Sequence, residues 1–89
     1  MPIVIYSEEK SGDRLASLCE EEWELPKLIP ALESWLSANH SRIKCGHYVA
    51  DIGFAVREDA GGGGSALSPE TMRIMAACGM WLFLSEYRR

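Results

Sequence analysis

The clearest pattern in the chain is an alternation of apolar positions between Gly46 and Arg57. Side chains on a β-strand point to opposite faces in turn, so this pattern predicts a strand with one buried face and one mostly solvated face. Gly53 falls inside it, where a bend would keep so long a strand within a small domain. The apolar positions of one parity are Tyr48, Ala50, Ile52, Phe54 and Val56.

Two further strands are predicted at the ends of the chain. Residues 3–6 form a short run of β-forming residues, and residues 80–87 form a longer apolar run. The second run is apolar on both faces, with Met80, Leu82 and Leu84 on one side and Trp81, Phe83 and Tyr87 on the other. In a two-layer domain one sheet face should be polar, so we expect a second molecule to cover the aromatic face. The alternative is that the three aromatic side chains belong to an internal core.

Two amphipathic helices are predicted between the strands. Ala31, Leu32, Trp35 and Leu36 recur at helical spacing in a segment that we expect to begin between Pro26 and Pro30 and to end at Asn39. The second helix has stronger boundary signals. Ser68 is suited to the N-cap, Pro69 to the first helical position and Gly79 to the C-terminal cap.

The remaining segments are less regular. Residues 8–24 are predicted to be irregular or to hold a short helix that Asp13 caps and that runs through Leu15, Leu18 and Cys19. Residues 58–66 form a glycine-rich connection. We therefore predict a single small α+β domain over residues 1–89, in the order β-α-β-α-β. An antiparallel-rich sheet of about three strands would carry the two main helices packed on one face.

Size and charge narrow the function classes. A chain of 89 residues and 9.9 kDa allows one domain, and its net charge of −4 disfavours a nucleic-acid partner, which requires a basic surface. No apolar run reaches the length of a membrane span, and the N-terminus lacks a signal-peptide pattern. Three cysteines without a paired motif favour a reduced, cytoplasmic protein with no metal and no cofactor.

Two groups of residues carry possible chemistry. Cys45 and His47 are two residues apart on a predicted strand, at about 7 Å, which is close enough for the contact that a thiol enzyme needs. Asp51 is too far along the strand to orient His47. The thiol enzyme is our third function class, after the interaction module and the ligand-binding domain, and we predict no catalytic residue. A small-ligand or anion site could use Gly62, Gly63 and Ser68, because a helix N-terminus presents free N–H groups. The phosphate-loop motif itself is absent.

The C-terminal part of the chain resembles a known family. Leu67-Ser68-Pro69-Glu70, a helix ending near Gly79 and a final apolar strand ending at Tyr87 resemble an uncharacterised bacterial family of small α+β proteins, and the likeness extends over residues 23–87. Members of that family have a longer N-terminal half, and some are immunity-like in setting. The resemblance implies a binding role by analogy only.

These observations favour a non-catalytic protein–protein interaction module that acts as a homodimer. Its interface would contain Trp81, Phe83 and Tyr87, because aromatic residues concentrate at the centres of interfaces. An unidentified protein partner is the other possibility. The small-ligand or anion-binding domain is the alternative function.

Overall fold

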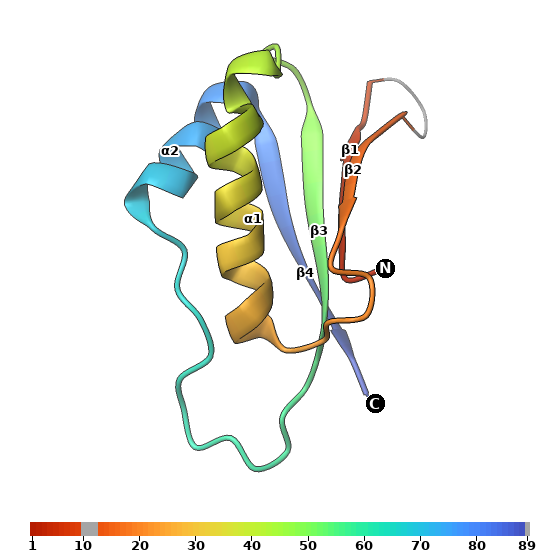
Figure 1. Cartoon of the computed structure of the whole chain (residues 1–89), viewed down its shortest axis with the longest axis vertical. Coiled ribbons are helices and arrows are strands. Elements are labelled where there is room, and N and C mark those ends of the chain that lie inside the picture. Colours follow the sequence, from red (N-terminus) through yellow and green to blue (C-terminus); the bar gives the residue numbers. More distant parts are fainter. Residues whose placement is uncertain (10–12, 89) are drawn as a thin grey trace.

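Four strands form one sheet in the order β2-β1-β3-β4, and two helices lie against it (Figure 1). The structure is a computed structural model that describes residues 1–9 and 13–88. The elements are β1 (Ile3–Ser7), β2 (Asp13–Leu18), α1 (Leu25–Asn39), the short 3-10 helix η1 (His40–Arg42), β3 (Tyr48–Ala55), α2 (Pro69–Cys78) and β4 (Met80–Tyr87).

The sheet is mixed. β1 is antiparallel to both β2 and β3, whereas β3 is parallel to β4. The parallel pair arises because the chain leaves the end of β3, passes through the glycine-rich connection and returns through α2 before β4 begins (Figure 1). The α+β class is confirmed, but the prediction of about three antiparallel strands misses one strand and the parallel pair.

The extra strand is β2, within the segment predicted to be irregular or helical. Leu15, Leu18 and Cys19 have helical spacing over little more than one turn, and an isolated turn of helix is unstable. Pairing with β1 supplies hydrogen bonds to Asp13–Leu18, with Leu18 opposite Ile3. A register shift next to Tyr6 breaks the simple alternation along β2, which concealed the strand from the sequence pattern.

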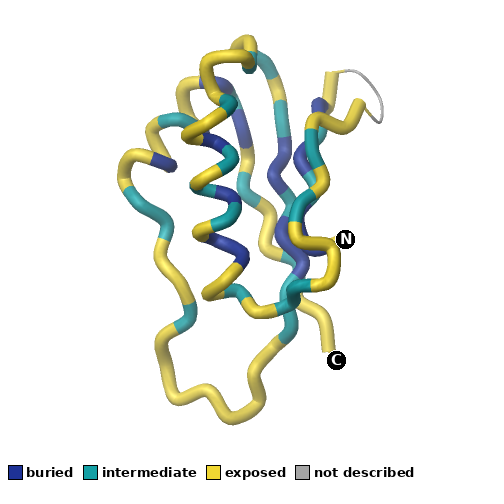
Figure 2. Tube along the Cα trace, in the orientation of Figure 1, coloured by how far each residue is buried: buried dark blue, intermediate teal, exposed yellow. Residues whose placement is uncertain are grey.

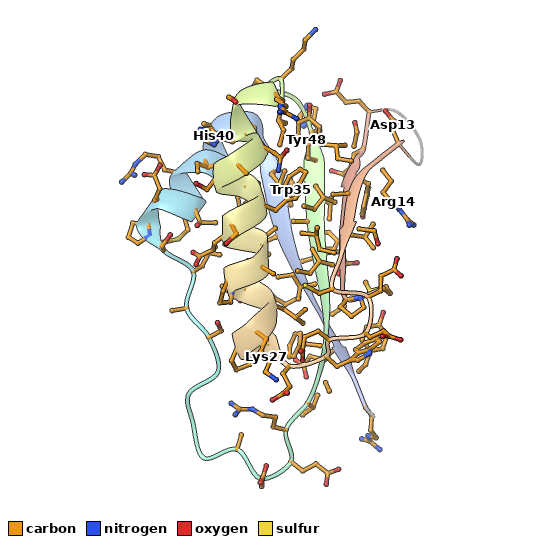
Figure 3. The ribbon with its side chains drawn as sticks, viewed as in Figure 1. Asp13, Arg14, Lys27, Trp35, His40 and Tyr48 are labelled. Atoms are coloured by element: carbon orange, nitrogen blue, oxygen red, sulfur yellow. The ribbon has the colours of Figure 1, made fainter. Side chains whose placement is uncertain are left out.

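One face of the sheet packs on the helices, and the core lies between the two layers (Figures 1 and 2). Ile3, Ile5, Ala50 and Ile52 alternate toward α1 and are fully buried, whereas Tyr48 and Phe54 of the same β3 face are partly buried. Trp35 points from α1 toward the sheet and packs against this core (Figure 3). The buried cluster comprises Ile3, Ile5, Leu28, Ile29, Leu32, Leu36, Ala50, Ile52, Met75, Cys78 and Met80.

Both helices end where their boundary residues indicate, but α1 begins earlier than predicted. α1 starts at Leu25, so Pro26 lies in the first turn and Pro30 lies inside the helix. Pro30 is exposed, and it removes a single backbone hydrogen bond, which the buried face of α1 compensates. The α2 prediction is confirmed: the Ser68 side chain accepts a hydrogen bond from the backbone N–H of Thr71 at 3.1 Å, and Gly79 caps the C-terminus.

Candidate functional site

The side of the sheet away from the helices carries an aromatic strip on β4. Trp81 is 64% exposed and Phe83 is 45% exposed, and both belong to the parity opposite to buried Met80. The structure therefore leaves these two predicted interface residues outside the internal core. On the other face of β4, Leu84 is 54% exposed.

Tyr87, the third predicted interface residue, lies partly under its own chain. Its ring makes an edge-to-face contact with Trp23, with ring centroids 5.5 Å apart. The Trp23 carbonyl also accepts a hydrogen bond from the backbone N–H of Ala55 at 2.8 Å, which ties the segment before α1 to the end of β3. Tyr87 nevertheless remains 42% exposed, so all three predicted interface residues lie at the surface, and Tyr87 also contacts Trp23 of its own chain.

The same face contains a small buried patch and one polar pair. Val49 is fully buried although no helix covers this face, and its neighbours in register are Tyr6 and Trp81. The Ser85 hydroxyl donates to Asp51 Oδ1 at 2.7 Å, so the carboxylate on this face is satisfied by a neutral neighbour. Apart from this pair, the surface around Phe83 offers apolar contact.

The outer edge of β4 is the second feature of the surface. Tyr48 N–H donates to Gly79 C=O, and Val56 N–H donates to Tyr87 C=O. Residues of odd number in β4 therefore direct their backbone groups toward β3, and the alternation of a strand directs those of Leu82, Leu84 and Glu86 outward. β4 is the last strand of the sheet, and no other described strand pairs with its outer edge.

The predicted ligand site at the start of α2 already holds a carboxylate. Glu33 Oε2 on α1 accepts hydrogen bonds from Ser68 N–H and from the Thr71 hydroxyl, each at 2.8 Å. An anion bound here would compete with Glu33. Gly62 and Gly63 both have positive φ, but the glycine-rich segment extends away from the start of α2 (Figure 1).

Glu33 also makes stability pH-dependent. The hydrogen bonds from Ser68 N–H and the Thr71 hydroxyl lower the pKa of Glu33 below 4.5. A lowered pKa stabilises the fold above the unfolded-state pKa, and this contribution is lost as the pH falls through the folded-state value. We expect Glu33→Gln to lower the free energy of unfolding by about 1 kcal/mol at pH 7, and the difference from the wild type to shrink below pH 4.5.

Urea unfolding at several pH values measures this effect. Glu58→Gln is the matched control, since Glu58 is exposed and lies in the connection after β3. It should leave the free energy of unfolding unchanged across the same range. A Glu33→Gln difference that stays constant between pH 7 and pH 3 would contradict a role for the ionised carboxylate.

The sequence placed Cys45 beside His47, but in the structure Cys45 shares a cavity with Cys78. Cys45 lines a cavity of about 230 Å³ together with Cys78 and His40, and His47 is not part of its lining. Burial raises the pKa of the Cys78 thiol, and the nearby Cys45 thiol adds to this effect. Cys78 was missed as a partner of Cys45 because the two residues are far apart in sequence.

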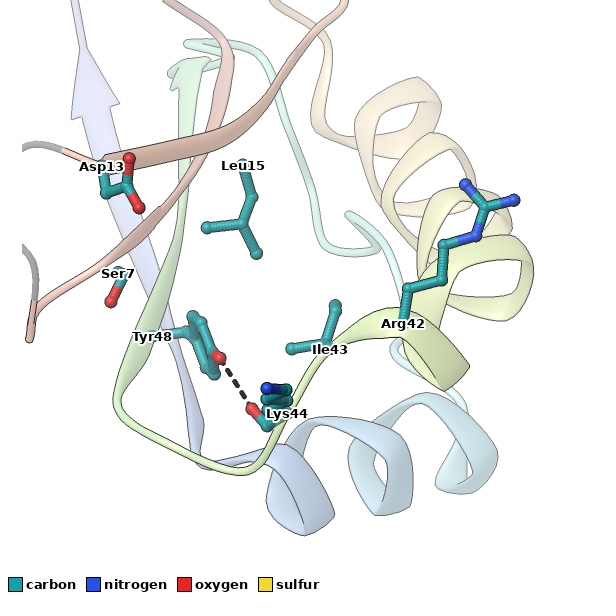
Figure 4. A pocket seen from close by; sticks show the side chains of 7 residues that line it. All are labelled: Ser7, Asp13, Leu15, Arg42, Ile43, Lys44 and Tyr48. Carbon is teal, nitrogen blue, oxygen red and sulfur yellow. Dashed lines mark hydrogen bonds between the residues drawn. The ribbon is translucent and has the colours of Figure 1, made fainter.

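A larger cavity lies between the β1–β2 hairpin and η1 (Figure 4). It has a volume of about 340 Å³, with Asp13 on one side and Arg42 on the other. The Tyr48 hydroxyl donates to the Lys44 carbonyl at 2.6 Å and is thereby occupied. Its lining includes the Ser7 hydroxyl and the Asp13 carboxylate but no thiol and no imidazole.

Neither the remaining side-chain clusters nor the comparisons with known proteins assign a function to this chain. Within residues 1–9 and 13–88, no cluster of three histidine, cysteine or acidic side chains could hold a metal ion. Neither described helix combines the length and hydropathy needed to cross a membrane. Searches against protein-family models, curated proteins and solved structures find no significant match to this chain. The family resemblance of residues 23–87 stays a prediction.

Proposed function

We propose that this protein is a non-catalytic protein–protein interaction module that forms a homodimer through β4. By analogy, we propose that it is a small accessory protein similar to immunity proteins. The observation that carries the proposal is the uncovered aromatic strip of Trp81 and Phe83 beside an unpaired strand edge. An exposed apolar edge strand is a template for pairing with another chain, and proteins normally cover or interrupt such an edge.

The size of the aromatic strip favours contact through the edge as well as the face. At their observed exposures of 64%, 45% and 42%, Trp81, Phe83 and Tyr87 together offer roughly 300 Å² of surface. A stable interface buries about 800 Å² on each partner. The three rings alone are too small an interface, so the neighbouring backbone and side chains of β4 must contribute.

An antiparallel contact between two β4 strands adds the backbone and the neighbouring side chains of β4 to the aromatic contact. A two-fold axis perpendicular to the sheet keeps both aromatic strips on one side and both helix layers on the other. If the axis passes at Phe83, the two Phe83 side chains face each other and Leu82 lies opposite Leu84 of the partner subunit. The outward backbone groups of Leu82 and Leu84 then form the hydrogen bonds between subunits, and the half-exposed Leu84 side chain becomes covered.

Light scattering after size-exclusion chromatography tests this proposal. The wild-type protein should have twice the chain mass of 9.9 kDa at micromolar concentration. We expect Leu84→Pro to give a folded monomer, because proline removes an outward N–H but no hydrogen bond to β3. Leu84→Ala is the matched control: it retains the N–H and should remain dimeric.

Two results would overturn the dimer model. If the wild-type protein is monomeric at about 100 µM, the β4 edge does not form a dimer at ordinary cellular concentrations. A Leu84→Pro variant that remains fully dimeric excludes the β4 edge as the contact. Circular dichroism of both variants confirms that any monomer is a folded one.

A further inference from the structure

Cys45 and Cys78 lie side by side although they come from different elements. Cys78 is the last residue of α2, and Cys45 lies in the segment between η1 and β3. The backbone N–H of Gly46 donates to the Cys78 carbonyl at 3.0 Å. Because this bond joins groups that are each two covalent bonds from a cysteine Cα, peptide geometry places the two Cα atoms roughly 4.5–6.5 Å apart.

Both cysteines belong to the lining of the same cavity. Cys45 and Cys78 line the 230 Å³ cavity from opposite segments, with His40 and Arg73 also in its lining. A disulfide requires Cα atoms about 4.4–6.8 Å apart and side chains that converge. The backbone contact satisfies the first condition, and the shared cavity is the space in which the two side chains would meet.

We propose that Cys45 and Cys78 form a dithiol site that low-molecular-weight disulfides, of the class of oxidised glutathione, convert to an intramolecular disulfide. This proposal does not depend on the dimer. It requires only that the exposed thiol reacts first and that the buried thiol resolves the adduct. Cys45 is exposed and Cys78 is buried, so the structure assigns these two roles.

The reaction is a pair of thiol–disulfide exchanges. The Cys45 thiolate attacks one sulfur of the small disulfide, a protein–S–S–R bond forms, and the first RS⁻ leaves and takes up the proton that Cys45 lost. The Cys78 thiolate then attacks Sγ of Cys45, and the second RS⁻ leaves with the proton of Cys78. One small disulfide is reduced to two thiols, and the protein dithiol is oxidised to one disulfide.

The third cysteine, Cys19, can be replaced so that it does not interfere with the experiment. Cys19 is exposed and lies outside the cavity, so Cys19→Ser leaves only the proposed pair. Trypsin cleavage after lysine and arginine then places Cys45 in the peptide 45–57 and Cys78 in the peptide 74–88. A disulfide between them joins two peptides that are otherwise separate, which mass spectrometry detects directly.

The test treats the reduced Cys19→Ser protein with excess oxidised glutathione at low protein concentration. We expect a product lighter by two hydrogen atoms, without a glutathione adduct and with the two peptides linked. Adding Cys78→Ala should trap glutathione on Cys45, because the resolving thiol is gone. Adding Cys45→Ser should leave Cys78 unmodified, because its thiol is buried.

Several outcomes would overturn the site. A stable glutathione adduct on Cys45 in the presence of Cys78 would show that the second exchange does not occur. A disulfide between two molecules, recognised by its doubled mass, would exclude an intramolecular pair. Reaction of Cys78 in the Cys45→Ser variant would reverse the assigned roles. Circular dichroism of each variant excludes unfolding as the source of new reactivity, and none of these outcomes bears on the β4 interface.

Discussion

Replacing Gly79 with alanine is expected to lower the free energy of unfolding by at least about 3 kcal/mol. Gly79 has a φ of 80°, a left-handed conformation that costs an L-residue about 1–2 kcal/mol. A β-carbon at this position would also overlap the backbone carbonyl of Gly46. Since Gly46 N–H and Tyr48 N–H bond to this same junction, the backbone cannot move away without breaking those hydrogen bonds.

Gly61→Ala is the matched control for this substitution. Gly61 has no heavy atom within 4 Å of an added β-carbon, and it is not among the glycines with positive φ. Its replacement should change the free energy of unfolding by less than about 1 kcal/mol, with any gain coming from a less flexible unfolded chain. Urea unfolding of both variants measures the contrast. A Gly79→Ala loss below about 1 kcal/mol would contradict the close approach of the two backbones.

The double substitution Trp81→Ser and Phe83→Ser is expected to convert the proposed dimer to a monomer. Aromatic residues at the centre of an interface often contribute about 2 kcal/mol or more each, so the dimer Kd should rise at least about 100-fold. Since Trp81 is 64% exposed and Phe83 is 45% exposed in one chain, the monomer should keep its fold. Light scattering over a concentration series measures the change in Kd.

Met72→Ser provides the control for the aromatic strip. Met72 is 50% exposed, but it lies on α2, in the helix layer. Its replacement removes exposed apolar surface elsewhere and should leave the dimer Kd unchanged. If Met72→Ser weakened the dimer as much as the double substitution did, the contact would lie on the helix layer and the β4 proposal would be wrong. The single substitution Phe83→Ser leaves Trp81 in place beside Val49, so any rise in the dimer Kd then comes from the interface and not from lost packing within the chain.

Local patterns predicted the two helices because their signals are complete within a few residues. The α2 boundaries follow from Ser68 and Gly79, which satisfy backbone groups at each helix end regardless of the rest of the fold. The β3 alternation was equally direct, since every second side chain packs on one helix layer. Pro30 was misleading because its effect on a helix depends on burial of the opposite face, which the sequence does not state.

That a second chain covers β4 stays a prediction, but the structure shows which side chains of this strand remain exposed. The apolar character of both faces of β4 is visible in the sequence, and the structure leaves Trp81, Phe83 and Tyr87 exposed. Contact between Tyr87 and Trp23 was not visible, because it joins segments 64 positions apart. Glu33 at the start of α2 was missed for the same reason: it reaches Ser68 from another helix.

Sequence alone determined that this chain forms an α+β domain with two capped or amphipathic helices and an unusually apolar final strand. These properties depend on side-chain periodicity and on boundary residues, which act over one or two turns. Only the tertiary structure decided the strand order, the pairing of β2 with β1, and the meeting of Cys45 with Cys78. Those contacts join distant segments, and they form because the whole chain buries one shared core, which no local pattern encodes.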